Sequence, residues 1–226
     1  MKILLFYVSH RQTDEIVYSG ILLNKTKFLK ENADVYLYCN NKNISIENLE
    51  DYLSIYEMNT KLYHTEKNAG YMYGLYEAID DSFEEFYGYD YVVHLHPDYF
   101  IYDENHIVNI IRQMEETESS FGVCFDRNDN TNNTGYHSGL FIFKPTKEIH
   151  NYFKLWKDLQ KINSKTIEFN NEVVPLVAEF VILYIVRNSG KKYVYWERPA
   201  GWNPHDGIWH THNNNLISRY ISENNL

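Results

Sequence analysis

Tyr91-Val92-Val93-His94-Leu95-His96-Pro97-Asp98 is a short apolar run that leads directly into side chains able to bind a metal ion. The apolar residues predict a buried strand, and Pro97 ends its regular hydrogen-bond ladder because proline lacks an N–H group. Asp98 then lies just past the strand, where open α/β sheets place their ligands. His96-Pro97-Asp98 is therefore the first candidate site in the chain.

Strand patterns alternate with helical patterns on both sides of this run. Strands are predicted at residues 2–8, 34–39, 61–64, 91–95, 121–125, 140–143 and 192–196. Helices are predicted at residues 14–30, 46–56, 71–87, 104–116, 147–160 and 174–186. Residues 126–134, rich in Asn and Asp, predict a loop. This alternation predicts an α/β fold with a mostly parallel central sheet and helices on both faces.

Length and composition restrict the class of protein. The 226 residues fit one domain, and a formal net charge of -10 argues against a nucleic-acid partner, which needs a basic face. No membrane span is expected, because the most apolar stretch, residues 173–186, is shorter than the ~20 residues that a spanning helix needs. The apolar run at residues 3–8 is too short for a secretory signal, which favours a cytoplasmic location. Cys39 and Cys124 are expected to be buried free thiols.

Several short segments follow one another in an order that is itself informative. The first strand ends in Tyr7-Val8-Ser9-His10, and the second ends at Asn40. Asn68-Ala69-Gly70-Tyr71-Met72-Tyr73-Gly74 opens the helix before the central strand, and His137-Ser138-Gly139 precedes a later apolar strand that Pro145 closes. With His96-Pro97-Asp98 between them, these segments resemble the GT-A fold glycosyltransferases over most of residues 1–212. The resemblance implies one GT-A-like (Rossmann-like) domain, residues 1–226, with a nucleotide-binding half at 1–101 and an acceptor-binding half at 102–226.

A divalent metal, Mn²⁺ or Mg²⁺, is implied by this resemblance. His96-Pro97-Asp98 falls where the family has an Asp-x-Asp metal motif, and His210 or His212 matches its C-terminal metal ligand. Asp98 would supply a hard oxygen ligand, whereas the imidazole of His96 suits manganese better than magnesium. The cation would neutralise the charge that develops on a nucleotide diphosphate leaving group. His94 lies one pleat deeper on the same strand face, so we expect it to pack in the core.

The donor would be a nucleotide diphosphate sugar, with uridine as the commonest base for this fold. The resemblance implies contacts to base and ribose from Tyr7, Ser9 and Asn40. Small residues at a helix entry let the backbone approach phosphate or ribose, which suits Asn68, Gly70 and Gly74. Arg11 and Lys67 are the nearest basic candidates for the diphosphate. The remaining donor-site candidates are His137, Ser138, Gly139 and Trp209.

The implied reaction moves the sugar to a hydroxyl acceptor during polysaccharide or glycan assembly. Glu179 is the single charged residue between Glu172 and Arg187, and a carboxylate in such an apolar helix can serve as a general base. It would make the transfer inverting, with Asp206 as the second candidate base, and retention of configuration stays open. Aromatic residues between Trp196 and Trp209 are the expected acceptor contacts.

Three other classes stay open. His94-Leu95-His96 imitates the His-x-His pair of barrel amidohydrolases, so a metal-dependent hydrolase could use His94, His96, His210 and His212. A nucleotidyltransferase shares the sheet, but it should show a glycine-rich basic loop after the first strand, where this chain has Ser9-His10-Arg11-Gln12-Thr13. The aromatic C-terminal segment would also permit a noncatalytic carbohydrate-binding module.

Overall fold

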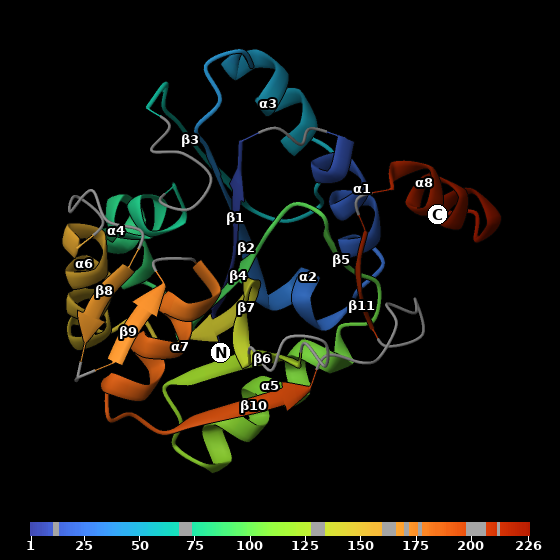
Figure 1. Cartoon of the computed structure of the whole chain (residues 1–226). Helices are drawn as coiled ribbons and strands as arrows, with labels where there is room; N and C mark the ends of the chain where they lie inside the picture. Colours follow the sequence, from blue (N-terminus) through green and yellow to red (C-terminus); the bar gives the residue numbers. More distant parts are fainter. Residues whose placement is uncertain are drawn as a thin grey trace.

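The computed structural model describes residues 1–10, 14–67, 74–127, 134–159, 166–169, 172–175, 178–197, 207–211 and 213–226. A central sheet runs through both halves of the chain in the order β10-β6-β7-β4-β1-β2-β3 (Figure 1). Its strands are β1 (Ile3–Ser9), β2 (Ala33–Cys39), β3 (Thr60–His64), β4 (Tyr91–Leu95), β6 (Phe121–Arg127), β7 (Thr134–Phe143) and β10 (Tyr193–Glu197). β7 runs antiparallel to β4 and β6, and the other neighbours are parallel. The predicted mostly parallel sheet is confirmed.

Helices cover both faces of this sheet, because each buried strand alternates its apolar side chains between two cores. In β1, Leu4, Phe6 and Val8 face one core, and Ile3 and Leu5 face the other. The first core is closed by α4 (Gly74–Phe86), α6 (Lys147–Leu159) and α7 (Ala178–Asn188). The second is closed by α1 (Asp14–Leu23), α2 (Phe28–Asn32), α3 (Ile46–Leu53) and α5 (Asn105–Glu116).

Two small sheets and a C-terminal helix complete the described part. β5 (Tyr99–Ile101) pairs antiparallel with β11 (Ile208–His210), and β8 (Thr166–Phe169) pairs with β9 (Glu172–Pro175). α8 (Asn214–Glu223) packs against α1 through a third cluster that holds Leu22, Phe100, Ile217 and Ile221. β5 and β11 therefore run side by side next to α1 (Figure 1). The sequence patterns did not predict β5, β8, β11 or α8.

Three local predictions are wrong. The helix predicted at residues 14–30 is two helices, because the chain turns after Leu23, where the Thr26 hydroxyl donates to the Leu23 carbonyl at 2.7 Å. The helix predicted at 174–186 begins only at Ala178, and Glu172–Pro175 is instead a strand of a hairpin. In the loop predicted at 126–134, residues 126, 127 and 134 are instead strand residues of β6 and β7, and these two strands pair with each other.

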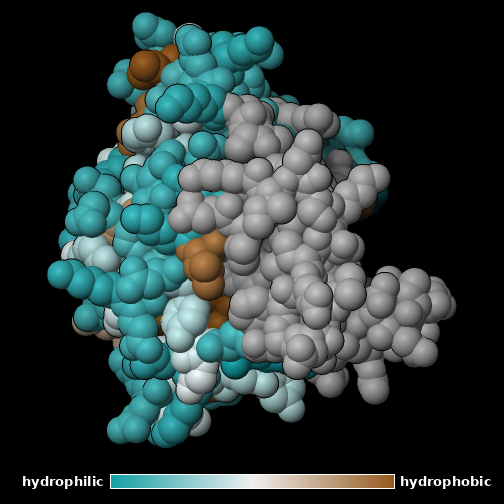
Figure 2. All heavy atoms as spheres, turned by 60° about the vertical axis from the view of Figure 1, so that its left-hand side comes forward, coloured by the Kyte–Doolittle hydropathy of each residue, from teal (hydrophilic) through white to brown (hydrophobic). Residues whose placement is uncertain are grey.

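The surface and the thiols agree with the composition. Cys39 and Cys124 are buried and free, as predicted. The face shown in Figure 2 is mainly hydrophilic where residues are described, with isolated hydrophobic side chains. Across the helices that the structure describes, none combines the length and the apolar character that a membrane crossing requires.

Candidate functional site

Several of the predicted site residues lie at the carboxyl ends of β1, β2 and β4, at one edge of the sheet. The Asn40 N–H donates to the Ser9 carbonyl at 3.1 Å, so the first two strand ends are joined. The His96 N–H donates to the Gly139 carbonyl at 2.9 Å, which brings the 137–139 segment beside the central strand. The Thr211 N–H donates to the Asp98 carbonyl at 3.2 Å, so the far end of the chain also reaches this edge.

The His96–Asp98 turn is compact and largely buried. Asp98 is 2% exposed, Pro97 is buried, and His96 is partly exposed. The Tyr99 N–H donates to the His96 carbonyl at 3.0 Å, which closes the turn before β5 starts. A carboxylate oxygen is a ligand that both Mn²⁺ and Mg²⁺ accept, whereas an imidazole nitrogen suits Mn²⁺ better than Mg²⁺. His96 and Asp98 could therefore contribute two ligands of different hardness.

His94 lies beneath this turn, as the strand alternation predicts. It is 0% exposed, and its Nδ1 lies 3.2 Å from the Phe6 carbonyl. Burial, with a smaller contribution from neighbouring His96, holds the pKa of His94 well below its usual range. The His94 and His96 rings are 5.4 Å apart in an edge-to-face arrangement. His94 is therefore a neutral core residue that packs against His96.

The structure describes only some of the predicted metal ligands. Among the side chains that the structure describes, no three His, Cys, Asp or Glu residues gather in a way that could hold a metal ion. His210 is described by its backbone, where it pairs with Tyr99 next to Asp98, and His212 lies outside the described residues. Metal binding by His210 or His212 stays a prediction.

Gly139 is required by packing against the site. A Cβ added there would lie 2.5 Å from Cε2 of Tyr99, a ring that is 1% exposed. The absent side chain thus lets β7 approach the residue that follows the turn. Ser138, 4% exposed, precedes it, and His137 is described by backbone only. Donor contacts from these three residues remain predictions.

Asn40 and Gly74, both predicted donor-site residues, lie close together. A Cβ on Gly74 would lie 3.1 Å from Nδ2 of Asn40, so the amide sits against the first residue of α4. Asn40 is 3% exposed, and its Oδ1 has no hydrogen-bond partner among the described residues. A buried acceptor of this kind is often completed by a ligand or water. Asn68 and Gly70, which precede Gly74 in the chain, lie outside the described residues.

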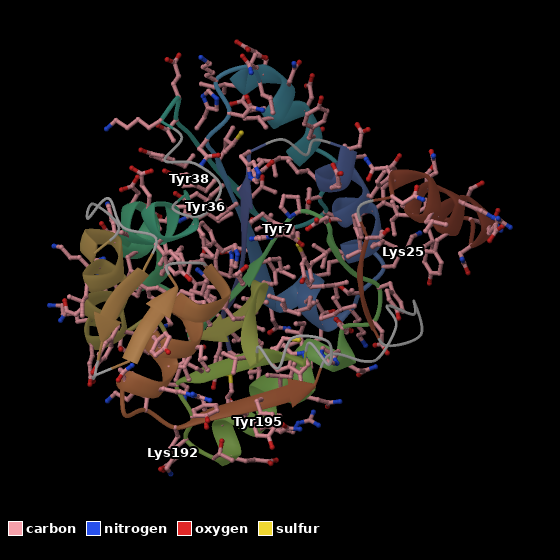
Figure 3. All side chains as sticks on the ribbon, viewed as in Figure 1. Tyr7, Lys25, Tyr36, Tyr38, Lys192 and Tyr195 are labelled. Carbon is pink, nitrogen blue, oxygen red and sulfur yellow. The ribbon has the colours of Figure 1, made fainter. Side chains whose placement is uncertain are left out.

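Tyr7, which is predicted to contact the nucleotide, is buried, and that contact stays a prediction. Its side chain is 2% exposed and packs in the second core, inside the molecule (Figure 3). Burial raises the pKa of the Tyr7 hydroxyl, and the neighbouring Ser19 hydroxyl opposes this shift. In this conformation the ring presents no surface to a ligand, so Tyr7 supports the strand end from below. Ser9 is also buried, at 0% exposure, and its carbonyl accepts from Asn40 at this edge of the sheet.

The remaining predicted residues divide into three groups. Lys67 is exposed just after β3, and its N–H donates to the Thr65 hydroxyl at 3.1 Å. Glu179 and Trp209 are described by backbone only, in the first turn of α7 and opposite Phe100 in β11. Arg11 and Asp206 lie outside the described residues. Their predicted roles are therefore neither supported nor opposed by the geometry.

Sequence reasoning missed one residue that touches the site. Ser19, 1% exposed in α1, donates from its hydroxyl to the Pro97 carbonyl at 3.4 Å. The available signal was the small pair Ser19-Gly20 in an otherwise apolar helix, since small residues let a helix approach its neighbour closely. Glu15, one turn earlier, is also buried at 8% exposure.

A polar hollow of about 540 Å³ lies elsewhere, at the amino ends of β1 and β2. Its lining includes Lys2, Asp34 and Asn59. This edge is opposite to the one that carries Asp98, because β1, β2 and β4 are parallel. Its shape therefore does not mark the candidate site, which we assign from the chemistry at the carboxyl ends.

Solved structures resemble this chain as a whole. A mannosyltransferase from Pyrobaculum calidifontis, in complex with GDP-Man and Mn²⁺, matches with a TM-score of 0.58 and 10% identity, over 87% of this chain and 55% of that one. A glycosyltransferase involved in the glycosylation of the major capsid of PBCV-1 matches with a TM-score of 0.57 and 12% identity, over 99% and 100%. A 4-diphosphocytidyl-2C-methyl-D-erythritol synthase from Anaerococcus prevotii matches with a TM-score of 0.58 and 11% identity, over 100% and 96%.

These likenesses show the fold and not the reaction, because the identities are low. The chain spans about half the length of the mannosyltransferase, at 55%, and all of the PBCV-1 enzyme. Comparison of the sequence with protein-family models gives no match, and comparison with curated proteins gives none either. The mixed, mostly parallel sheet with helices on both faces is the GT-A-like, Rossmann-like fold that solved glycosyltransferases share.

Proposed function

We propose that this chain is a glycosyltransferase that moves a sugar from a nucleotide diphosphate sugar to a hydroxyl acceptor in polysaccharide or glycan assembly. One observation carries the proposal: buried Asp98 follows the central strand, and the C-terminal segment is hydrogen-bonded to it. Open α/β sheets bind ligands at this edge. Solved structures of this fold include complexes with GDP-Man and Mn²⁺ and, in S. aureus TarS, with UDP-GlcNAc.

The donor would lie across the ends of β1, β2 and β4. Asn40 offers a buried amide oxygen next to the start of α4, whose amino end adds a favourable dipole for phosphate. Asp98 and His96 would hold Mn²⁺ or Mg²⁺, together with His210 or His212. When bound, such a cation neutralises the charge of the diphosphate leaving group.

Glu179 is the proposed general base. In an inverting transfer its carboxylate would accept the proton of the acceptor hydroxyl as that oxygen forms a bond to the anomeric carbon and the nucleotide diphosphate departs. Asp206 is the second candidate for this proton transfer. The aromatic residues between Trp196 and Trp209 would contact the acceptor.

A nucleotide-sugar screen tests this function. Thermal unfolding is measured with UDP, GDP and CDP sugars, each with and without Mn²⁺. A ligand at 100 times its Kd should raise the melting temperature by about 5 °C or more in a protein of this size. The response should disappear in Asp98→Asn and persist in Asp51→Asn, an exposed carboxylate on α3. The absence of any response in the wild-type protein would refute the proposed function.

Turnover then tests the base. Glu179→Gln should lower kcat by about 10²-fold or more while the thermal response to the donor remains. A similar loss in Asp206→Asn, with Glu179→Gln active, would transfer the role to Asp206. The anomeric configuration of the product, measured by NMR, decides between inversion and retention.

A nucleotidyltransferase is the second candidate function. The cytidylyl-type synthase from A. prevotii matches this chain over 100% of its length and 96% of its own. Against this reading, Ser9 and His10 and the three residues after them contain no glycine. Product analysis separates the two reactions, since nucleotidyl transfer from a nucleoside triphosphate releases pyrophosphate and glycosyl transfer releases a nucleotide diphosphate.

The described fold differs from that of the amidohydrolases, which were the basis of the hydrolase alternative. The described central sheet is open and seven-stranded, unlike the closed eight-stranded barrel of amidohydrolases. His94, the first member of the His-x-His pair, is fully buried against the Phe6 carbonyl. A noncatalytic carbohydrate-binding module stays open to the same test, because it would bind sugar without turning over a donor.

A further inference from the structure

Hydrogen bonds from separate parts of the chain hold the His96–Asp98 turn. Backbone bonds join the His96 N–H to Gly139, the His96 carbonyl to Tyr99 and the Asp98 carbonyl to Thr211, at 2.9, 3.0 and 3.2 Å. The Pro97 carbonyl accepts from a side chain, the hydroxyl of Ser19, at 3.4 Å. Each of the three residues in the turn is therefore anchored to a different neighbour.

The Pro97 carbonyl is the anchor that bears most directly on Asp98. Proline fixes its own φ and restricts the residue before it to extended backbone, so the torsion of Pro97 that stays free in the turn is ψ. That torsion orients the peptide plane between Pro97 and Asp98, and hence the direction of the Asp98 side chain. A donor on the Pro97 carbonyl thus contributes to the orientation of the Asp98 side chain.

Ser19 is held in place by its own helix. The Tyr56 hydroxyl donates to the Ile16 carbonyl at 2.7 Å, and the Tyr56 ring lies against Gly20, where an added Cβ would be 2.9 Å away. Tyr56 thus contacts α1 before and after Ser19, which is itself 1% exposed. Its hydroxyl is consequently presented to Pro97 by a rigid element.

We propose that Ser19 is a positioning residue of the donor site, acting through the Pro97 carbonyl on the direction of the Asp98 carboxylate. This inference rests on the proposed function. Loss of the hydroxyl would leave a buried carbonyl without this donor and let the peptide plane rotate. Residues that orient ligands in this way typically change metal affinity or activity by about 10- to 100-fold when mutated.

Ser82 provides a matched control. It is also 1% exposed, in α4, and its hydroxyl donates at the same 3.4 Å. The acceptor is Tyr36 (Figure 3), which packs in the first core, on the other face of the sheet. Ser19→Ala and Ser82→Ala therefore remove equivalent buried hydroxyls, one at the turn and one remote from it. Ser19→Thr, which keeps the hydroxyl, is the rescue variant.

The first readout needs no ligand. Hydrogen exchange of the Tyr99 and Thr211 amides, both bonded to the turn, should accelerate by about tenfold in Ser19→Ala. The second readout is the Mn²⁺ concentration that gives half of the thermal stabilisation by the donor, which should rise by about tenfold. Steady-state turnover should show lower kcat at unchanged acceptor KM. Ser82→Ala should change none of these quantities, and Ser19→Thr should restore them.

The outcomes separate this proposal from the proposed function. No nucleotide response in the wild-type protein would refute the function. A normal wild-type response with equal exchange rates in Ser19→Ala and Ser82→Ala would overturn the role of Ser19 alone. Faster exchange in Ser19→Ala without any change in Mn²⁺ dependence would also overturn it, because Ser19 would then only stabilise the fold.

Discussion

At the scale of single residues, Gly139 offers the sharpest steric prediction. Gly139→Ala places a Cβ 2.5 Å from the buried Tyr99 ring, so the ring or β7 must move. We expect the free energy of unfolding to fall by about 1–3 kcal/mol. The Gly139 carbonyl accepts a hydrogen bond from the His96 N–H. The affinity for the nucleotide sugar should therefore fall as well. Chemical denaturation and the thermal response to the donor measure the two effects.

Gly88 supplies the control for this substitution. A Cβ on Gly88 would meet its nearest atom only at 4.0 Å, so Gly88→Ala should leave stability nearly unchanged. Equal destabilisation by the two variants would show that Gly139 is not limited by the Tyr99 contact.

At the scale of residues, the sequence pointed to His96-Pro97-Asp98 as a candidate site but not to the contacts that hold this turn. His96-Pro97-Asp98 is recognisable because an apolar strand, a proline and a carboxylate are local in the chain. The contact between Ser19 and Pro97 joins residues 78 positions apart, and no periodicity encodes it. The burial of Tyr7 was not foreseen for a related reason: a polar tip at a strand end predicts exposure, whereas Tyr7 packs against residues of α1.

At the scale of elements, α2 depends on a carboxylate from a distant helix. The Glu104 side chain accepts the N–H groups of Lys27, Phe28 and Leu29 at 3.1, 3.0 and 2.7 Å, although α2 has no side-chain cap of its own. Removing such a cap typically costs about 1–2 kcal/mol. Glu104→Ala should therefore lower the midpoint of urea unfolding, whereas Glu116→Ala, exposed at the end of α5, should not. Equal midpoints for the two variants would contradict this role.

Asp80 predicts a pH dependence for the contact between α4 and α6. Burial opposes ionisation, but bonds from Lys157 and His150, at 2.6 and 2.8 Å, outweigh it and hold the pKa of Asp80 below its usual value. A carboxyl whose pKa is lowered by folding stabilises the protein above its unfolded pKa, near 3.8, and loses this effect as pH falls through the folded value. The stability difference between wild type and Asp80→Asn, measured by denaturation, should be present at pH 7 and should shrink below about pH 4. A difference that is constant across this range would exclude the mechanism.

The elements that were mispredicted share one physical cause. Residues 14–30 carry a helical pattern throughout, but Glu104, some 75 positions away, fixes a new helix start at Phe28. Residues 172–175 are as apolar as the helix that follows, yet β8 pairs with them and makes them a strand. In both cases contacts with a neighbouring segment, and not the local pattern of apolar residues, decided the structure.

At the scale of the whole molecule, the sequence predicted the mostly parallel direction of the strands but not the antiparallel strand β7. The alternation of strand and helix predicts parallel neighbours, and β4, β1, β2 and β3 follow that rule. β6 and β7 are joined directly as an antiparallel pair, which inserts β7 beside the central strand in the opposite direction. That insertion is what carries Gly139 to His96, so the site depends on the feature that the alternation did not predict.

The C-terminal helix α8 packs against the core and follows the segment that is hydrogen-bonded to Asp98. Ile217 of α8 is 0% exposed against Leu22 and Phe100, and α8 directly follows the segment whose Thr211 is bonded to Asp98. Ile217→Ala should destabilise the protein by about 2–4 kcal/mol and accelerate exchange of the Thr211 amide, because a buried cavity loosens the anchor of β11. Leu216→Ala is the control, since that neighbouring side chain is 46% exposed. If Ile217→Ala lowers stability while the Thr211 amide and the donor response stay unchanged, the C-terminal helix serves the core alone and β11 is held at Asp98 by its pairing with β5.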